Sequence, residues 1–329
     1  MKNAVETNLG LCQRLLSACV MLAVLVMIPM GCDSSPEPSE EAQLEPDDPL
    51  VDLTCVRFKW VDAPGIANRA AILVPVVAGG ATLRFQLDTG ATVSMIPGGS
   101  AAKFGIEHQY NREDGNWYTT PIDLELAGGQ YPGREVFVDP ELTRSEPAGT
   151  VGLDLLEGKI VVLDLAGQRF CLNDPDAPGV AALLEKTAFT PARFRDGKLF
   201  IEARLGGEAF DDIFYDTGAS AFPLQVDLSF WKQLTGRNGD EESNTRWEVR
   251  SADKTVAFIG APAVGSLEIG QARIENPMVF FREDQPDLFA EWEFSTRGFI
   301  GNVPFLEQVV VLDLRPDASR FGIVGPSSD

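Results

Sequence analysis

One short pattern occurs twice in this sequence and constrains its fold more than any other feature. Residues 85–92 read FQLDTGAT and residues 213–220 read IFYDTGAS, so each copy is an apolar run that ends in Asp-Thr-Gly-Ala. A single Asp-x-Gly is a common turn and would indicate little. Two copies with matched flanks predict two related halves, each of which presents a carboxylate, Asp88 or Asp216, at the end of a strand.

The repeat extends beyond these motifs in both directions. Gly79-Gly80 ends 8 residues before Asp88, and Gly206-Gly207 ends 9 residues before Asp216. Each Gly pair predicts the turn of a hairpin whose second strand delivers the aspartate. Downstream, residues 151–165 align without a gap onto residues 300–314, and each segment ends in a strand of the form Val-Val-Leu-Asp-Leu. We therefore predict an internal duplication of a small domain.

Composition favours sheet over helix throughout the chain. Of its 329 residues 44% are hydrophobic, and 31 Gly and 22 Pro separate short β-branched and aromatic runs. This pattern predicts an all-β, bilobal fold with few short helices. The predicted parts are an N-terminal lobe over residues 54–176, a linker over 177–189 with a helix at Val180–Lys186, a C-terminal lobe over 190–324, and a tail over 325–329. The polar segment Trp231–Asp253 is expected to be an exposed loop.

The first 53 residues do not resemble part of a folded domain. An apolar run from Leu15 to Met30 follows Lys2 and Arg14, so we interpret residues 1–31 as a signal peptide. Residues 32–53 are acidic and rich in proline, a composition that predicts a disordered tether. Gly31-Cys32 resembles the end of a bacterial lipoprotein signal, which implies lipidation of Cys32, although Pro29 and Met30 depart from that pattern. Simple secretion and an uncleaved anchor are the alternatives.

Net charge and cysteine usage limit which binding partners and which cellular compartments are expected. The formal net charge of −22 argues against nucleic acid as a partner, because that affinity rests on clustered Lys and Arg. Only Cys55 and Cys171 belong to the folded part. They can pair in an oxidising compartment or remain as two free thiols, and their spacing does not decide between these states. The expected location is outside the cytoplasm, anchored to a membrane by lipid and facing the periplasm or the cell exterior.

The paired Asp-Thr-Gly motifs resemble those of the pepsin-like and retroviral-type (retropepsin-like) aspartic proteases. Phe299-Ile300-Gly301 fits the second element of the family, an apolar-apolar-Gly segment, whereas Thr150-Val151-Gly152 has Thr in an apolar slot. The resemblance implies two related β-barrel-like lobes with a cleft between them. It also implies that the chain is a monomer, because one chain supplies both lobes, and that its substrate is a polypeptide.

The resemblance assigns roles to six residues. Asp88 and Asp216 are the implied catalytic pair, Thr89 and Thr217 hydrogen-bond to the opposite loop, and Gly90 and Gly218 let the two backbones approach closely. Two facing carboxyl groups that share one proton can activate water and protonate the leaving amine. Because two adjacent like charges cannot both ionise cheaply, the pair titrates with separated pKa values. This chemistry predicts an aspartic endopeptidase.

Other candidate sites are weaker. His108 is the only histidine, so the chain lacks a histidine-based triad, and neither a metal nor a cofactor is expected. Asp164 and Asp313 are expected to make structural hydrogen bonds. The family covers its cleft with a hairpin, for which we expect the span Gln109–Gln130, with Tyr110, Trp117 or Tyr118 as the ring that faces the substrate or packs on the lobe.

The alternative function is binding without catalysis. Residues 221–224 read AFPL, an unusually apolar run directly after the second motif. The same inter-lobe cleft then serves a non-catalytic lipoprotein that binds a peptide or an envelope partner.

Overall fold

The structure is a computed structural model that describes residues 48–251, 254–292 and 294–325. The predicted signal peptide, the lipidation site Cys32 and most of the predicted tether fall within residues 1–47, outside the described residues. The described part is mostly β-structure, so the predicted all-β class is confirmed. The predicted bilobal arrangement is confirmed as well. The described strands form one sheet of 15 strands and one of 10 strands, and neither sheet closes into a barrel.

The N-terminal lobe contains thirteen of the described strands and one short helix. In chain order its elements are β1 (Cys55–Arg57), β2 (Lys59–Ala63), β3 (Ala67–Ala78), β4 (Ala81–Leu87), β5 (Met95–Pro97), α2 (Gly98–Phe104), β6 (His108–Asn111), β7 (Asn116–Thr119), β8 (Ile122–Leu126), β9 (Gly129–Arg134), β10 (Phe137–Asp139), β11 (Gly149–Val151), the 3₁₀ turn η1 (Leu153–Leu155), β12 (Ile160–Asp164) and β13 (Arg169–Asn173).

The C-terminal lobe follows the predicted helix α3 (Val180–Lys186) and repeats the same plan. Its elements are β14 (Thr187–Arg195), β15 (Lys198–Leu205), β16 (Glu208–Tyr215), η2 (Thr217–Ala219), β17 (Leu224–Val226), α4 (Leu228–Thr235), β18 (Thr245–Ser251), β19 (Lys254–Pro262), β20 (Ser266–Ile269), β21 (Ala272–Glu275), β22 (Met278–Arg282), η3 (Phe289–Glu291), β23 (Gly298–Ile300), η4 (Val303–Phe305), β24 (Val309–Asp313) and β25 (Arg320–Val324).

Both predicted hairpins are present, with the Gly pairs at their turns. Strands β3 and β4 pair around Gly79-Gly80, and β15 and β16 pair around Gly206-Gly207. All four glycines have positive φ, between 57° and 89°. A two-residue turn with positive φ at both positions matches the twist of antiparallel strands, and only glycine adopts it without strain.

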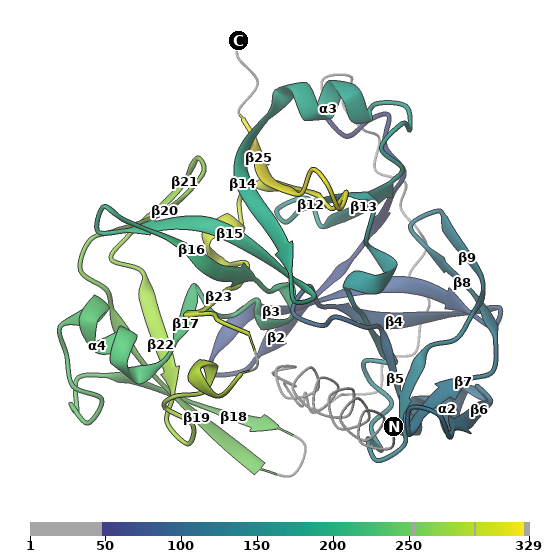
Figure 1. Cartoon of the computed structure of the whole chain (residues 1–329), viewed down its shortest axis with the longest axis horizontal. Helices are drawn as coiled ribbons and strands as arrows, with labels where there is room; N and C mark the ends of the chain where they lie inside the picture. The colour runs from purple at the N-terminus through teal and green to yellow at the C-terminus, as the bar shows by residue number, and fades with distance from the viewer. Residues whose placement is uncertain (1–47, 252–253, 293, 326–329) are drawn as a thin grey trace, which may run out of the picture.

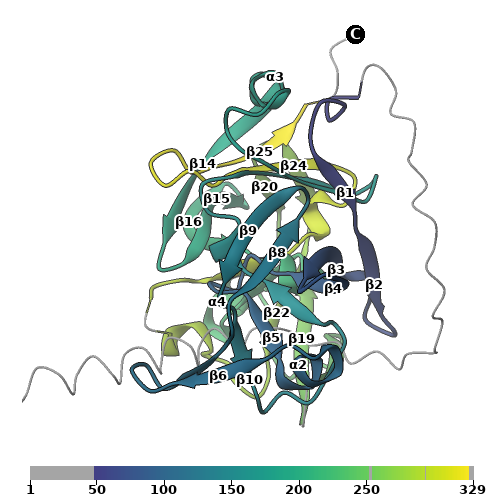
Figure 2. The same cartoon turned by 90° about the vertical axis from the view of Figure 1, so that its right-hand side faces the viewer.

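The two lobes are joined by a shared platform of six strands in the order β1-β13-β12-β24-β25-β14. At its centre β12 pairs antiparallel with β24, and Val162 lies opposite Val311, its equivalent in the repeat. Two copies of one strand that pair about their own midpoint generate approximate two-fold symmetry. In Figure 1 the platform and α3 lie at the top, the N-terminal lobe at the right and the C-terminal lobe at the left, and Figure 2 shows the same layers from the side.

The predicted loop Trp231–Asp253 is wrong over most of its length. Its first part belongs to α4, residues 245–251 form β18, and residues 236–244 connect them, whereas residues 252–253 lie outside the described residues. Trp231 is fully buried, and its Nε1 donates to the carbonyl oxygen of Val279 at 2.8 Å. The polar composition of this segment suggested a loop, although its first residues form a helix with one apolar, buried face.

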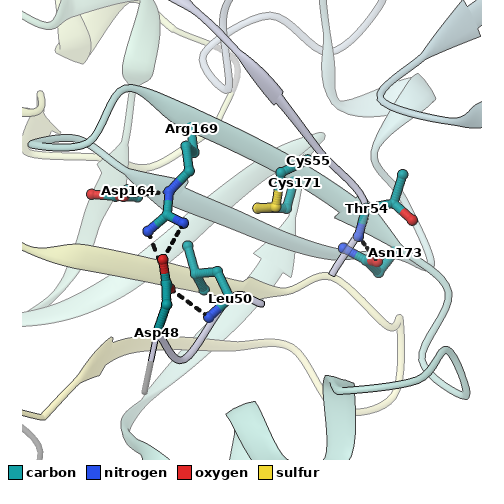
Figure 3. Close-up of a disulfide and its surroundings, with 8 residues drawn as sticks. All are labelled: Asp48, Leu50, Thr54, Cys55, Asp164, Arg169, Cys171 and Asn173. Carbon is teal, nitrogen blue, oxygen red and sulfur yellow. Dashed lines mark hydrogen bonds and ion pairs between the residues drawn. A yellow bond between two sulfur atoms is a disulfide. The ribbon is translucent and has the colours of Figure 1, made fainter. Parts of the chain in front are cut away.

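The predicted tether also ends earlier than residue 53. Leu50 is fully buried against the platform and α3, and the carboxylate of Asp48 is paired with Arg169 (Figure 3). Arg169 also contacts Asp164 at 2.8 Å. A buried leucine and a paired carboxylate order residues 48–53, which the acidic composition alone did not indicate.

Candidate functional site

The two aspartates lie side by side between the lobes, each at the end of the strand that the sequence predicted. Strand β11 runs parallel to β4, and β23 runs parallel to β16. The amide of Asp88 donates to the carbonyl of Val151 at 3.0 Å, and the amide of Asp216 donates to that of Ile300 at 2.9 Å. Thus the downstream apolar segments of the repeat hold the two carboxyl groups in place.

Thr89 and Thr217 connect the two loops through four hydrogen bonds. The amide of Thr89 donates to Oγ1 of Thr217 at 3.0 Å, and the amide of Thr217 donates to Oγ1 of Thr89 at 3.0 Å. Each hydroxyl in turn donates to the opposite strand, Thr89 to the carbonyl of Tyr215 at 2.9 Å and Thr217 to that of Leu87 at 3.0 Å. The cross-lobe contact implied by the resemblance is therefore present and reciprocal.

Gly90 and Gly218 leave the space that the opposite carboxyl group occupies. A Cβ atom on Gly90 would lie 2.6 Å from the carboxyl of Asp216, and one on Gly218 would lie 2.4 Å from that of Asp88. Neither distance is compatible with a side chain. Any residue larger than glycine would thus push the loops apart.

Burial keeps this pair partly protonated. Asp88 is 4% exposed and Asp216 is 1% exposed. Burial raises the pKa of both carboxyl groups, and the adjacent Asp88 raises the pKa of Asp216 further, so that it lies well above 3.8. We expect Asp216 to hold the shared proton and to donate it to Asp88 in a hydrogen bond between the two side chains.

Lys198 is a third charged group at the pair, and the sequence analysis missed it. It is 4% exposed at the start of β15, and its ammonium donates to the carbonyl of Gly90 and to Oγ1 of Thr92, at 3.2 Å for the latter. Its positive charge lowers the pKa of both aspartates relative to burial alone. A signal was present, because Lys198 stands eight residues before Gly206, where the first copy has Ala71 before Gly79.

The loop of the second motif is covered by the other lobe. A cavity of about 10 Å³ beside Gly218 is lined by Ala63, Ile66 and Ala70 from the β2–β3 hairpin, together with Ala219, Ala221, Phe222 and Val249. Phe222 packs against Trp247, Phe258, Phe280 and Phe299. The apolar run 221–224 is therefore core, and it is not an exposed binding surface.

The other candidate residues have structural surroundings. Cys55 and Cys171 form a disulfide that joins β1 to β13 (Figure 3). Asp313 pairs with Arg315 and Arg320, and His108 is exposed beside Trp117. Within the described residues no group of His, Cys, Asp and Glu side chains is arranged to hold a metal, and no helix has the length and apolar character needed to span a bilayer.

The span Gln109–Gln130 contains most of the β6–β7 hairpin and the start of the next one. Tyr110 is 50% exposed and rests on Trp117, with ring centroids 5.4 Å apart. Tyr118 instead donates to Asp114 at 2.9 Å and packs edge-on against Phe137. Of the three rings proposed for a flap, Tyr110 is the one that faces solvent.

Comparisons with known proteins give a likeness of fold. The chain resembles the crystal structures of conglutin gamma, a basic 7S globulin from lupine seeds, and of basic 7S globulin from soybean, each with a TM-score of 0.46 and 10% identity. The alignments cover 84% and 83% of this chain, and 95% and 96% of the two globulins. No family model matches the chain. No curated protein matches it either.

These findings correct the expected identity. Both solved structures are described as 7S globulins, one of them from seeds, and neither is described as a protease. The comparisons therefore do not support the predicted membership among aspartic proteases, nor the predicted endopeptidase, and both predictions are withdrawn. The lipoprotein signal that accompanied this resemblance has no support in the comparisons and is corrected with it.

Proposed function

We propose that the protein is a non-catalytic peptide-binding protein that holds an extended segment of a polypeptide partner between its two lobes. The observation that carries this proposal is the position of Lys198, whose ammonium is fixed against the loop of Asp88. The intact threonine and glycine contacts then serve as a rigid floor.

Lys198 reduces the proton affinity that burial gives the carboxyl pair. A general base must compete with water for a proton, and its strength falls as its pKa falls. The ammonium stabilises the ionised carboxylate and offsets part of the rise in pKa that burial gives both aspartates, whose pKa values stay above the ordinary one. Because Lys198 is buried and held by two oxygen atoms, this positive charge cannot swing away from the pair. The site is thus better suited to bracing the lobes than to hydrolysis.

Two sheet edges that have no neighbouring strand among the described residues favour an extended polypeptide as the ligand. Strand β6 is at one end of the 10-stranded sheet, and all four of its residues are exposed. Strand β18 is at one end of the other sheet. In Figures 1 and 2 their hairpins lie at the end of the molecule opposite the platform, one in each lobe. Unpaired N–H and C=O groups of an edge strand can bind an extended chain, and the exposed ring of Tyr110 adds an aromatic contact.

The disulfide supports a location outside the cytoplasm. Cys55 and Cys171 are bonded, and such bonds persist in oxidising compartments. Export and the monomeric state stay predictions.

The proposal is tested by measuring, in one experiment, whether peptides bind and whether they stay uncleaved. The full chain is incubated with overlapping decapeptides of reduced, carboxymethylated α-lactalbumin, binding is read by fluorescence anisotropy, and the peptides are recovered for mass spectrometry. We expect a subset to bind and all to remain intact. Tyr110→Ala should weaken binding about tenfold, as for a modest interface hot spot. The control is Val264→Ala, which removes an apolar side chain that is 73% exposed and lies elsewhere.

Two results would overturn the proposal. One is the absence of binding by every peptide in the series. The other is cleavage that disappears in the variant Asp88→Asn, which would show a working catalytic pair.

A further inference from the structure

A hollow of about 630 Å³ lies beside strand β14 at the side of the platform that belongs to the C-terminal lobe. It is lined by residues 189–195 of β14 and by residues 316–320, which lead into β25. Consecutive residues of a strand point to opposite faces of its sheet. Because seven consecutive residues of β14 line the hollow, it follows the edge of the strand and not one face. This shape suits an extended chain.

One edge of β14 is open beside this hollow. Strand β25 pairs with β14 only as far as Pro191, which lies opposite Arg320. Residues 192–195 continue beyond that point and pair with β15, the neighbour of β14 on its other side. Among the described strands none lies next to residues 192–195 on the side of β25. A further strand in line with β25 would therefore fit there.

The turn after β14 shows which backbone groups face this open edge. Asp196 and Gly197 form a two-residue turn with φ of 53° and 67°, so the flanking Arg195 and Lys198 exchange their backbone hydrogen bonds. Alternate residues of a strand direct N–H and C=O groups to opposite edges. The N–H and C=O groups of Phe194 therefore point to the open edge, where an extended chain can hydrogen-bond to them.

Three arginines reach the hollow from one face of the sheet. Arg193 and Arg195 are two residues apart on β14, and Arg320 lies opposite Pro191, which shares their face. The side chains of Arg193, Arg195 and Arg320 are 58%, 43% and 37% exposed. Each is paired with an aspartate that does not line the hollow, in the same order Asp211, Asp196 and Asp313. All three cations are thus accessible to a ligand.

Each guanidinium keeps unused donors. Within the described residues Arg193 donates hydrogen bonds through Nη2 alone, and Arg195 and Arg320 use only Nε and Nη2. The Nη1 group of each therefore makes no hydrogen bond. Exposed ion pairs contribute little to stability, so the aspartate partners of Arg193 and Arg195 do not prevent a second carboxylate from binding. A planar guanidinium matches a carboxylate in geometry.

We propose that this edge of β14 binds an extended polypeptide segment in which acidic and apolar residues alternate. A strand added beside β14 would place every second side chain on the face of Arg193 and Arg195, where carboxylates fit. The side chains between them would lie on the face of Ala192 and Phe194, where apolar groups fit. This site is separate from the region between the lobes, so the inference does not rest on the proposed function.

The charge of the whole protein opposes this preference and so makes it informative. A formal net charge of −22 repels an acidic segment at long range and favours a neutral one. At about 0.15 M salt the charges beyond about 8 Å are largely screened, whereas carboxylates in contact with arginines are screened less. Tighter binding of the acidic segment would therefore come from a local group of cations.

Three peptides that differ only in the identity or order of their residues test the pattern. Fluorescein-labelled SGEVEVEVGS has alternating Glu and Val, SGQVQVQVGS replaces each Glu with Gln, and SGEEEVVVGS has the composition of the first peptide without alternation. Fluorescence anisotropy measures their binding to the full chain in about 0.15 M NaCl. We expect the alternating acidic peptide to have a Kd at least about fivefold below that of each other peptide. Hydrogen exchange in residues 192–195 should slow when it binds.

Substitution of the arginines locates the site. The double variant Arg193→Gln/Arg195→Gln should abolish the preference for Glu over Gln. The matched control is Arg134→Gln/Arg273→Gln, which removes the same charge from two arginines that are 45% and 57% exposed and also paired with carboxylates. This control should leave the preference unchanged. The two single variants at positions 193 and 195 should each retain part of it.

The outcomes decide between this site and its alternatives. Equal binding of the three peptides would overturn the proposal, as would a preference that the double variant at positions 193 and 195 retains. Self-association of the wild type that this double variant abolishes, without binding of the acidic peptide, would identify a second copy of the chain as the occupant and overturn it as well. None of these results affects the proposed function, which places its ligand at β6 and β18.

Discussion

At the scale of single residues, hydrogen bonding indicates which oxygen of the carboxyl pair carries the proton. Oδ1 of Asp216 accepts from the amide of Gly218 at 2.8 Å, whereas Oδ2 is buried and accepts no hydrogen bond within the described residues. Oδ1 of Asp88 accepts from the amide of Ala91 at 3.0 Å. A proton on Oδ2 of Asp216 would convert its unsatisfied acceptor into a donor to Asp88. The raised pKa of Asp216 agrees with this arrangement.

This arrangement predicts that Asp216→Asn stabilises the protein at neutral pH. A carboxyl group whose pKa is raised on folding stabilises the fold below its unfolded pKa, near 3.8, and that contribution is lost as the pH rises through the folded value. Asparagine keeps an acceptor for Gly218 and a donor for Asp88 without ionising. We therefore expect the unfolding free energy of the variant, relative to that of the wild type, to increase as the pH rises from about 4 to about 7, and urea unfolding measures this difference.

The comparison with wild type isolates this group from the other acids. Ion pairing lowers the pKa of Asp48 and Asp313, and such groups stabilise the fold in the opposite direction, at higher pH. They are common to both proteins and cancel in the difference. Asp317→Asn, at an exposed aspartate, is the control and should leave the difference flat. A variant that loses stability relative to wild type as the pH rises would contradict the assignment.

Sequence reasoning predicted the paired part of the site and missed its cation. Asp88 and Asp216 were evident because each motif has a copy. Lys198 lies in neither motif, and the first copy of the repeat has Ala71 at the equivalent distance from its Gly pair. The difference between the two copies marks the position, but the contact of Lys198 with Gly90 joins segments far apart in the chain, and only the fold reveals it.

At the scale of elements, local chemistry explains what could be predicted. The Gly-pair hairpins and the helix α3 have short-range signals, and the structure places all of them as expected. Strand β1 has no such signal, since it is three residues long at the edge of the platform and, among the described strands, pairs with β13 alone. What holds it is the disulfide between Cys55 and Cys171, 116 residues apart in sequence. The position of β1 therefore depends on tertiary contacts and not on a local sequence signal.

This dependence predicts a large effect of removing the disulfide. The double variant Cys55→Ala/Cys171→Ala should lose about 2–5 kcal/mol of unfolding free energy, because the open chain gains conformational freedom. Urea unfolding of the full chain measures the loss, and hydrogen exchange should show faster exchange in β1 than in β12. Wild-type protein under reducing conditions should behave like the variant. A loss below about 1 kcal/mol would mean that β13 and the buried Leu50 hold this segment without the disulfide.

At the scale of the whole molecule, the platform and the threonine loops are two of the contacts that join the lobes. The platform pairs β12 with β24, and the floor joins the two threonine loops. The pairing of β12 with β24 joins two repeated strands, and their apolar pattern is visible in the sequence. The contact between the threonine loops consists of four buried hydrogen bonds, whose partners come together only in the folded chain. If the floor holds a peptide without hydrolysing it, its stiffness is what these bonds contribute to function.

The threonine floor predicts a distinct effect of Thr217→Val. The variant keeps the shape of the side chain but leaves the amide of Thr89 and the carbonyl of Leu87 without their partners. Each buried group left unsatisfied costs about 1–3 kcal/mol, so we expect a total loss of about 2–6 kcal/mol. Thr150→Val is the matched control, since the buried hydroxyl of Thr150 has no partner within the described residues and its removal should cost little. Urea unfolding compares the two variants, and equal losses would show that the cross-lobe bonds do not hold the lobes together.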